Sequence, residues 1–300
     1  MKTTFFLIIF FIFIFSSKCQ YNNPFLNYRK RSNQNKALTR TRQKPIKQFP
    51  KPQRNRQKTL NIRENGRFQK NIEPLIGKPQ FQTLFQQFQS GLSINNFVMN
   101  IIEILRYQNT HLFPDNYAKN TIAFKNHIST IKDNNGFIED QHKYTDMAYG
   151  KKRLSENGCG LIAVYNVIYF LTKNENIDFP AIVKALEYDG IILSGLFGTS
   201  SKAIDDYLKR QGFKTKSSSK MSEYDYIGNY FDAFVLTILN NKNDIAAGMH
   251  FVAITKENGG YTVHNNGYQS TSVTYTSIRD ILTRINSGKA KDIYLTGVKI

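Results

Sequence analysis

The stretch Ser155–Val167 reads SENGCGLIAVYNV and holds one cysteine, Cys159, between two glycines at the start of an apolar run. Residues 161–171 are apolar on nearly all sides, which predicts a buried helix. Cysteines that staple secreted domains come in pairs. A lone cysteine at a helix N-terminus, where the helix dipole favours the thiolate, is typical of a nucleophile. We therefore take Cys159 as the candidate nucleophile.

Residues 1–19 have the pattern of a secretory signal peptide. An apolar run at 5–15 is too short to span a bilayer, and Ser17 and Cys19 are small residues before a cut at Gln20. No later segment is apolar for long enough to cross a membrane. We expect a secreted or extracytoplasmic protein with no transmembrane segment in the mature chain. An uncleaved leader or a lipid anchor on Cys19 is the alternative.

Residues 20–70 carry most of the positive charge, with fifteen Lys or Arg between 29 and 70 against one acid, Glu64. This segment has no apolar period and is rich in Pro, Gln and Asn, which predicts disorder. Three interpretations remain open. Residues 29–70 bind an anionic surface such as nucleic acid, acidic glycan or lipid headgroups, or 20–70 is a propeptide processed near Arg29, or it is a solvated linker.

Residues 71–149 are expected to form a helical N-terminal region. Apolar residues recur at three- and four-residue spacing in 81–88 and again in 94–107, the period of a helix. A turn is predicted at 133–136. The region is interpreted either as a small helical subdomain or as a prosegment that packs over the part that follows.

Residues 150–300 have the texture of one compact domain in which helices come first and antiparallel strands follow, an α+β layout. A Gly-rich loop at 195–201 lacks the Lys of a phosphate-binding loop, so we interpret it as a helix-entry turn that borders the site. The expected helices are 178–189, 201–211 and 277–285, and the expected strands are 233–239, 249–255, 261–265, 271–275 and 292–298, the last of which closes the sheet.

His250 is the candidate base among the five histidines, because it heads an apolar strand, where we expect its ring to be accessible at a sheet edge. The alternative is a strand-end histidine bonded to the main chain. A hairpin brings Asn266, sixteen residues later, back beside it, and an amide oxygen there would orient the ring. Strand alternation favours Asn266 over Asn265, and a kink at Asn265 would reverse the choice.

Together these elements resemble the papain-like cysteine peptidase superfamily, in the branch of the bacteriocin-processing peptidases. The resemblance lies in NGCGLIA at the start of a helix, HFVAI at the start of a later strand, and VHNN at its return. It covers about residues 150–300 and implies a papain-like fold. It further implies Cys159 as nucleophile, His250 as general base and then acid, and Asn266 as the orienting group.

Two positions depart from the family pattern. The family usually has Gln six residues before the cysteine as an oxyanion donor, and Arg153 stands there. Leu161 replaces a common proline. Asn157 is a possible replacement donor. Loss of one such donor typically costs about 10²–10³ in rate, so the departure bears on activity more than on fold.

The leading hypothesis is a secreted thiol hydrolase that cleaves a peptide or amide bond in a peptide or protein substrate. We expect no cofactor, and no spacing of ligand residues indicates a metal site. Two alternatives remain. One is an acyltransferase or deamidase with the same triad, and the other is a non-catalytic papain-like binding protein that docks to anionic partners through its basic arm.

Overall fold

The computed structural model describes residues 94–106, 113–195, 198–240, 248–266 and 274–300. The expectations for the leader, the basic segment and the helix at 81–88 therefore lie outside the described residues. Within the described ranges, no helix is both long enough and apolar enough to cross a membrane.

The described residues before position 150 form the α-helices α5 (Ile94–Arg106), α6 (Pro114–Phe124) and α7 (Ile128–Asp133). The last of these ends at the predicted turn, where Asn135 and Gly136 both have positive φ. The described part of the N-terminal region is thus helical, as expected. One continuous hydrophobic core crosses position 150, because Ile138 and Tyr149 pack in the same cluster as the helices that follow.

The helices predicted after position 150 are found close to their expected bounds, as α9 (Cys159–Thr172), α10 (Phe179–Asp189) and α11 (Ser201–Arg210). The short helix α8 (Leu154–Asn157), just before Cys159, was not predicted. Asp178 caps α10 by accepting from the Ala181 N–H, and Ser200 caps α11 in the same way at Ala203. Each cap satisfies a donor that the helix itself leaves unpaired.

The main sheet has six strands in the order β3-β8-β4-β5-β6-β7, with antiparallel pairing throughout. A second, two-stranded sheet pairs β1 (Ala148–Tyr149) with β2 (Lys152–Arg153). The strands of the main sheet are β3 (Lys214–Ser218), β4 (Ala233–Leu239), β5 (Met249–Glu257), β6 (Gly260–His264), β7 (Thr274–Tyr275) and β8 (Lys291–Lys299).

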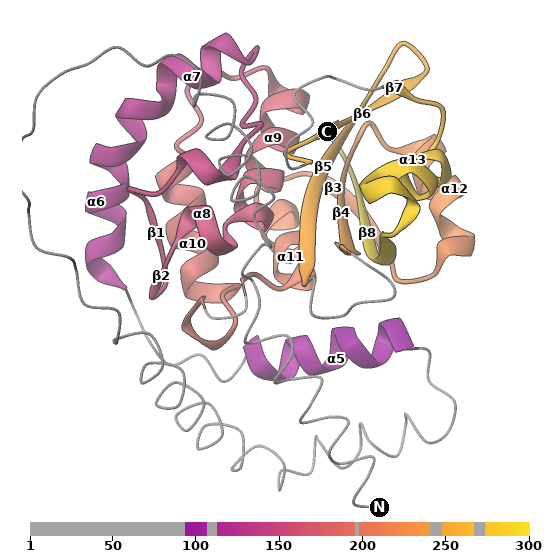
Figure 1. The fold of residues 1–300 in the computed structure, drawn as a ribbon, viewed down its shortest axis with the longest axis horizontal. Helices are drawn as coiled ribbons and strands as arrows, with labels where there is room; N and C mark the ends of the chain where they lie inside the picture. The colour runs from indigo at the N-terminus through magenta and orange to yellow at the C-terminus, as the bar shows by residue number, and fades with distance from the viewer. Residues whose placement is uncertain (1–93, 107–112, 196–197, 241–247, 267–273) are drawn as a thin grey trace, which may run out of the picture. The chain divides into compact units, whose positions relative to one another are not determined.

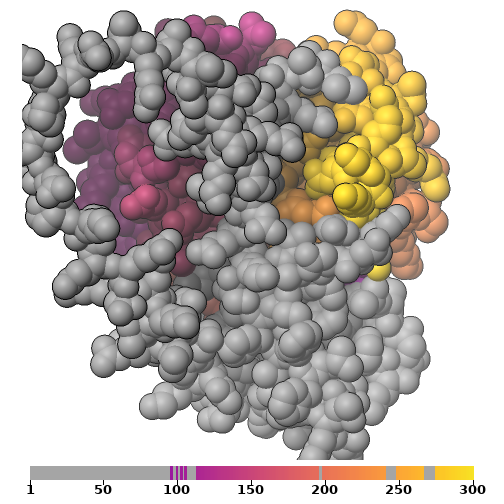
Figure 2. Space-filling model, in the orientation of Figure 1, coloured from indigo at the N-terminus to yellow at the C-terminus, as the bar shows by residue number. Residues whose placement is uncertain are grey.

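Helices cover both faces of this sheet, as Figure 1 shows. Phe251 and Ala253 of β5 pack with α9 in one core, whereas Val252 and Ile254 belong to a second core on the other face. That second core is closed by α12 (Tyr224–Tyr230) and α13 (Ile278–Arg284). Ile300 is exposed, and part of the C-terminal region, yellow in Figure 2, is visible at the surface. The α+β layout is confirmed.

Two expectations about the sheet were incomplete or wrong. β8 does not close the sheet but lies inside it, between β3 and β4. The edge beyond it is formed by β3, whose polar sequence KTKSS gave no strand signal. An edge strand with one open side does not need alternating apolar residues, so the sequence pattern did not predict β3.

Candidate active site

Cys159 is the first residue of α9 and follows directly on Gly158, where α8 ends. Its thiol forms no disulfide and its side chain is almost covered, with 9% exposed. A Cβ on Gly158 would lie 2.6 Å from the Leu154 carbonyl oxygen, so only glycine fits this tight turn. The position at the helix N-terminus favours a negative charge on sulfur.

The Gly-rich loop packs against this turn. A Cβ on Gly160 would lie 3.2 Å from the Thr199 side chain, and the Thr199 hydroxyl is 2.8 Å from the Tyr149 hydroxyl. The amide nitrogen of Asn157 donates to the Gly195 carbonyl, while its buried amide oxygen has no partner among the described residues. The loop therefore borders Cys159, and the Asn157 amide ties the loop to it.

His250 is the second residue of β5, and its side chain is buried, with 5% exposed. The expectation of an accessible ring is wrong, because β5 lies inside the sheet between β4 and β6. Burial lowers the pKa of His250, and the nearby charge of His142 lowers it further, whereas the hydrogen bond that the ring donates to the Asn265 carbonyl raises it. The imidazole is therefore neutral at pH 7.

One hydrogen bond fixes the His250 ring. Its Nε2 lies 2.8 Å from the main-chain carbonyl oxygen of Asn265. A carbonyl only accepts, so Nε2 carries the proton and Nδ1 of the neutral ring carries the lone pair. The hydrogen bond at Nε2 thus identifies Nδ1 as the ring nitrogen that can take a proton.

Asn265, not Asn266, is brought to His250. Asn265 has φ +56°, a kink that ends β6, and its side-chain oxygen accepts from the Gln141 N–H at 3.1 Å. Asn266 is half-buried and makes no hydrogen bond to His250 among the described residues. The group that orients the ring is a main-chain carbonyl and not a side-chain amide.

A segment of residues 137–143, which we call the strap, joins α9 to this kink. The Asn166 side chain on α9 binds both the N–H and the C=O of Ile138, at 2.8 and 2.9 Å. At the next residue, Glu139 accepts from the Asn265 N–H at 3.0 Å. Gln141 donates to the Ser155 carbonyl at 3.0 Å, four residues before Cys159. Sequence reasoning missed Glu139 and Gln141, because nothing local marks a polar loop residue with a distant partner.

Cys159 and His250 lie at the same end of the fold. α9 packs on β5, and their far ends are joined by an ion pair between Lys173 and Glu257 at 3.4 Å. From these ends, 14 residues of helix rise about 21 Å back to Cys159. The seven residues of strand back to His250 rise about 23 Å. The helix and the strand therefore run over similar lengths from this ion pair to Cys159 and His250.

A second path of contacts agrees with this placement. Thr199 lies against Gly160 next to the nucleophile, and Ser201 binds the Thr237 hydroxyl at 2.9 Å. Thr237 is paired across the sheet with Phe251, the neighbour of His250. Because side chains alternate along β5, the Cα–Cβ bond of His250 points to the face opposite α9. From there the ring extends to the end of β6.

The sequence matches no protein-family model. It also matches no curated protein. The assignment of a function therefore depends on the site alone.

His142 is a second histidine near the site that sequence reasoning did not select. It lies in the short helix η2 (Gln141–Lys143), which packs on α8 just before Cys159. Its Nδ1 is 3.1 Å from Asp140, and hydrogen bonding from His142 is the main cause that lowers the pKa of Asp140. This carboxylate–imidazole pair is a rival to His250 as the base.

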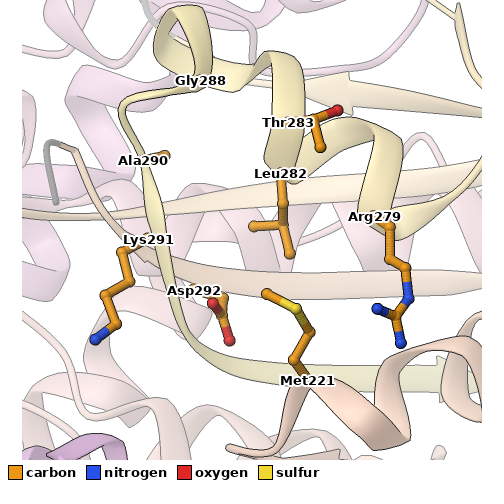
Figure 3. A pocket seen from close by; sticks show the side chains of 8 residues that line it. All are labelled: Met221, Arg279, Leu282, Thr283, Gly288, Ala290, Lys291 and Asp292. Atoms are coloured by element: carbon orange, nitrogen blue, oxygen red, sulfur yellow. The ribbon is translucent and has the colours of Figure 1, made fainter.

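Two further features lie apart from this arrangement. Arg153 is exposed on β2, and the described residues contain no group of three or more His, Cys, Asp or Glu placed to hold a metal ion. A hollow of about 630 Å³ opens beside α13 and β8 (Figure 3). Met221 and Leu282 line its apolar part, and none of its lining residues is a candidate site residue.

Proposed function

We propose that this chain is a thiol hydrolase of papain-like type that cleaves a peptide or amide bond. Cys159 is the nucleophile, His250 is the general base and then the general acid, and the Asn265 carbonyl orients the ring. The observation that carries the proposal is the hydrogen bond from His250 Nε2 to Asn265, because it leaves the Nδ1 lone pair as the proton acceptor.

In the proposed reaction, Nδ1 of His250 takes the thiol proton and the Cys159 sulfur attacks the substrate carbonyl carbon. The tetrahedral intermediate collapses as the imidazolium returns its proton to the leaving amine, which gives a thioester on Cys159. Water, deprotonated by the same imidazole, then releases the acid and restores the thiol. The Cys159 N–H at the start of α9 is placed to stabilise the oxyanion.

The ring and the thiol must approach each other for the first step. Catalytic hydrogen bonds are often long or poorly aligned without substrate and shorten in the complex. We propose that substrate binding closes this gap. Hydrogen bonding through the strap already ties the loop that precedes Cys159 to the kink that holds His250.

A non-catalytic binding protein on the same scaffold is the second candidate. It is favoured by the near-complete burial of Cys159. In that case the site would be a relic, and the basic segment 29–70 would carry the interaction with an anionic partner. Secretion through residues 1–19 is part of both proposals.

The test is a peptide library incubated with the full chain and analysed for cleavage by mass spectrometry. We expect new termini that disappear with Cys159→Ala and with His250→Ala, together with a thioester adduct on Cys159. Products that join two peptides instead of releasing acids would assign acyl transfer. Identical product sets from the wild type and Cys159→Ala would contradict the proposed function.

A further inference from the structure

The Glu139 carboxylate binds two groups at the end of β6 at once. Its Oε1 lies 2.6 Å from Nδ1 of His264, and its Oε2 accepts from the Asn265 N–H at 3.0 Å. Both partners are buried, at 4% and 2% exposed. A carboxylate that accepts two hydrogen bonds from consecutive residues fixes the main chain between them.

His264 is itself held in place, so it serves as a fixed anchor for Glu139. Its ring stacks on Phe137 of the strap with the ring centres 4.0 Å apart and the planes 13° from parallel. Its Nε2 lies 2.9 Å from the Thr255 hydroxyl on the neighbouring strand. In the neutral ring, Nδ1–H donates to Glu139 and Nε2 accepts from Thr255.

The held conformation is one that a chain does not adopt without support. Asn265 has φ +56°, a region that few non-glycine residues occupy, although Asn does so more readily than most. In this conformation its N–H points to Glu139, its side chain binds Gln141 and its carbonyl oxygen faces His250. The three contacts are consequences of a single backbone geometry.

We infer that Glu139 is a positioning residue for His250. It acts through Asn265: the carboxylate keeps the kink in its left-handed conformation, and the kink keeps the carbonyl on Nε2 of the base. The catalytic meaning of this inference rests on the proposed function, whereas the positioning itself does not. Glu139 touches neither Cys159 nor His250, and the described structure gives it no other partner than His264 and Asn265.

The ring tautomer of His250 is the most direct readout of this role. Histidine-selective ¹⁵N labelling and long-range ¹H–¹⁵N spectra distinguish Nε2–H from Nδ1–H, and single His→Gln variants assign the five histidines. In the wild type we expect one tautomer at His250, with the proton on Nε2. A merely structural role of Glu139 would not move this signature.

Three variants of the full chain decide the inference. In Glu139→Ala we expect the single tautomer at His250 to be replaced by exchange between both. Glu139→Gln keeps an acceptor for the Asn265 N–H and should retain the wild-type signature. Glu257→Ala removes a carboxylate at the other end of the same hairpin, where it pairs with Lys173, and should change nothing.

An unchanged His250 signature in Glu139→Ala would overturn the inference, provided that the variant is folded by circular dichroism. Alkylation of Cys159 by iodoacetamide at pH 7 separates this outcome from failure of the proposed function. If the tautomer depends on Glu139, we expect Glu139→Ala to slow alkylation by about tenfold. This is the effect expected from losing one hydrogen bond to a charged group, here the bond from the Asn265 N–H to the Glu139 carboxylate. A tautomer change with unchanged alkylation would retain the positioning role and contradict the proposed base.

Discussion

The Nε2 of His250 lies 2.8 Å from the main-chain carbonyl oxygen of Asn265, at the residue where β6 ends in a kink. A side-chain amide can be replaced by mutation, but a main-chain carbonyl is set by the path of the chain. The geometry of the His250 ring is therefore a property of the kink and of the strap that holds it, more than of any one side chain.

This relationship separates two neighbouring asparagines. Asn266→Ala should change the free energy of unfolding by less than about 0.5 kcal/mol, the usual range for a substitution away from such contacts. Asn265→Ala loses the contact with Gln141 and disfavours positive φ, so we expect a loss of about 1–3 kcal/mol. Chemical denaturation of both variants checks this difference. A larger loss for Asn266→Ala would contradict the assigned geometry.

Stability should depend on pH through His250. Because burial lowers its pKa in the folded state below about 6.5, the unfolded chain binds the proton first as the pH falls. The contribution is fully present above about pH 6.5 and is lost progressively between that value and the lowered pKa. We expect His250→Gln to lose less stability than the wild type between pH 7.5 and pH 5, measured by urea unfolding. Parallel losses in both proteins would argue against a buried neutral ring.

The Asn166 side chain should stabilise the strap. Its amide satisfies both polar groups of Ile138 in a fully buried position, so Asn166→Leu leaves a donor and an acceptor unpaired. Each such group costs about 1–3 kcal/mol, and we expect a total loss of at least about 2 kcal/mol by denaturant unfolding. Thr172→Val, at an exposed site of the same helix, is the control. Equal losses of stability in Asn166→Leu and Thr172→Val would contradict the role given to the strap.

The turn before the nucleophile should accept no side chain. In Gly158→Ala, the new Cβ would meet the Leu154 carbonyl oxygen at 2.6 Å, so the turn must shift. We expect a loss of about 1–3 kcal/mol, as for other overpacked sites, and slower alkylation of Cys159. Gly212→Asn is the comparison, because it carries the backbone strain of φ +90° but meets no atom, so a larger loss in Gly158→Ala reports the steric overlap. An unchanged free energy of unfolding in Gly158→Ala would contradict the close packing of this turn.

Most helices after position 150 (α9, α10, α11 and α13) and the central hairpin could be predicted because their signals are local. The apolar run after Cys159, the Asp178 cap and the Glu257–Gly260 turn each specify structure over a few residues. The same is true of β4, whose seven residues are all buried and were predicted with the correct bounds. These elements place Cys159 at the start of a helix and His250 at the start of a strand.

The remaining features depend on contacts between distant parts of the chain. Glu139 meets Asn265 from 126 residues away, and no spacing rule anticipates that pairing. The position of β8 inside the sheet was missed for the same reason, since strand order is fixed by packing and not by pattern. The kink at Asn265 is intermediate, because an Asn-Asn-Gly sequence marks a turn without saying which residue turns.

The central claim is that Cys159 and His250 act as nucleophile and base. The most direct measurement is the rate of iodoacetamide alkylation of Cys159 from pH 5 to pH 10, followed by peptide mass spectrometry in the wild type, His250→Ala and His142→Ala. We predict a half-maximal rate in the wild type well below about pH 8.5, the value of an ordinary thiol, and a return to that value in His250→Ala alone. A wild-type profile centred near pH 8.5 and unchanged by His250→Ala, or one shifted only by His142→Ala, would contradict the claim.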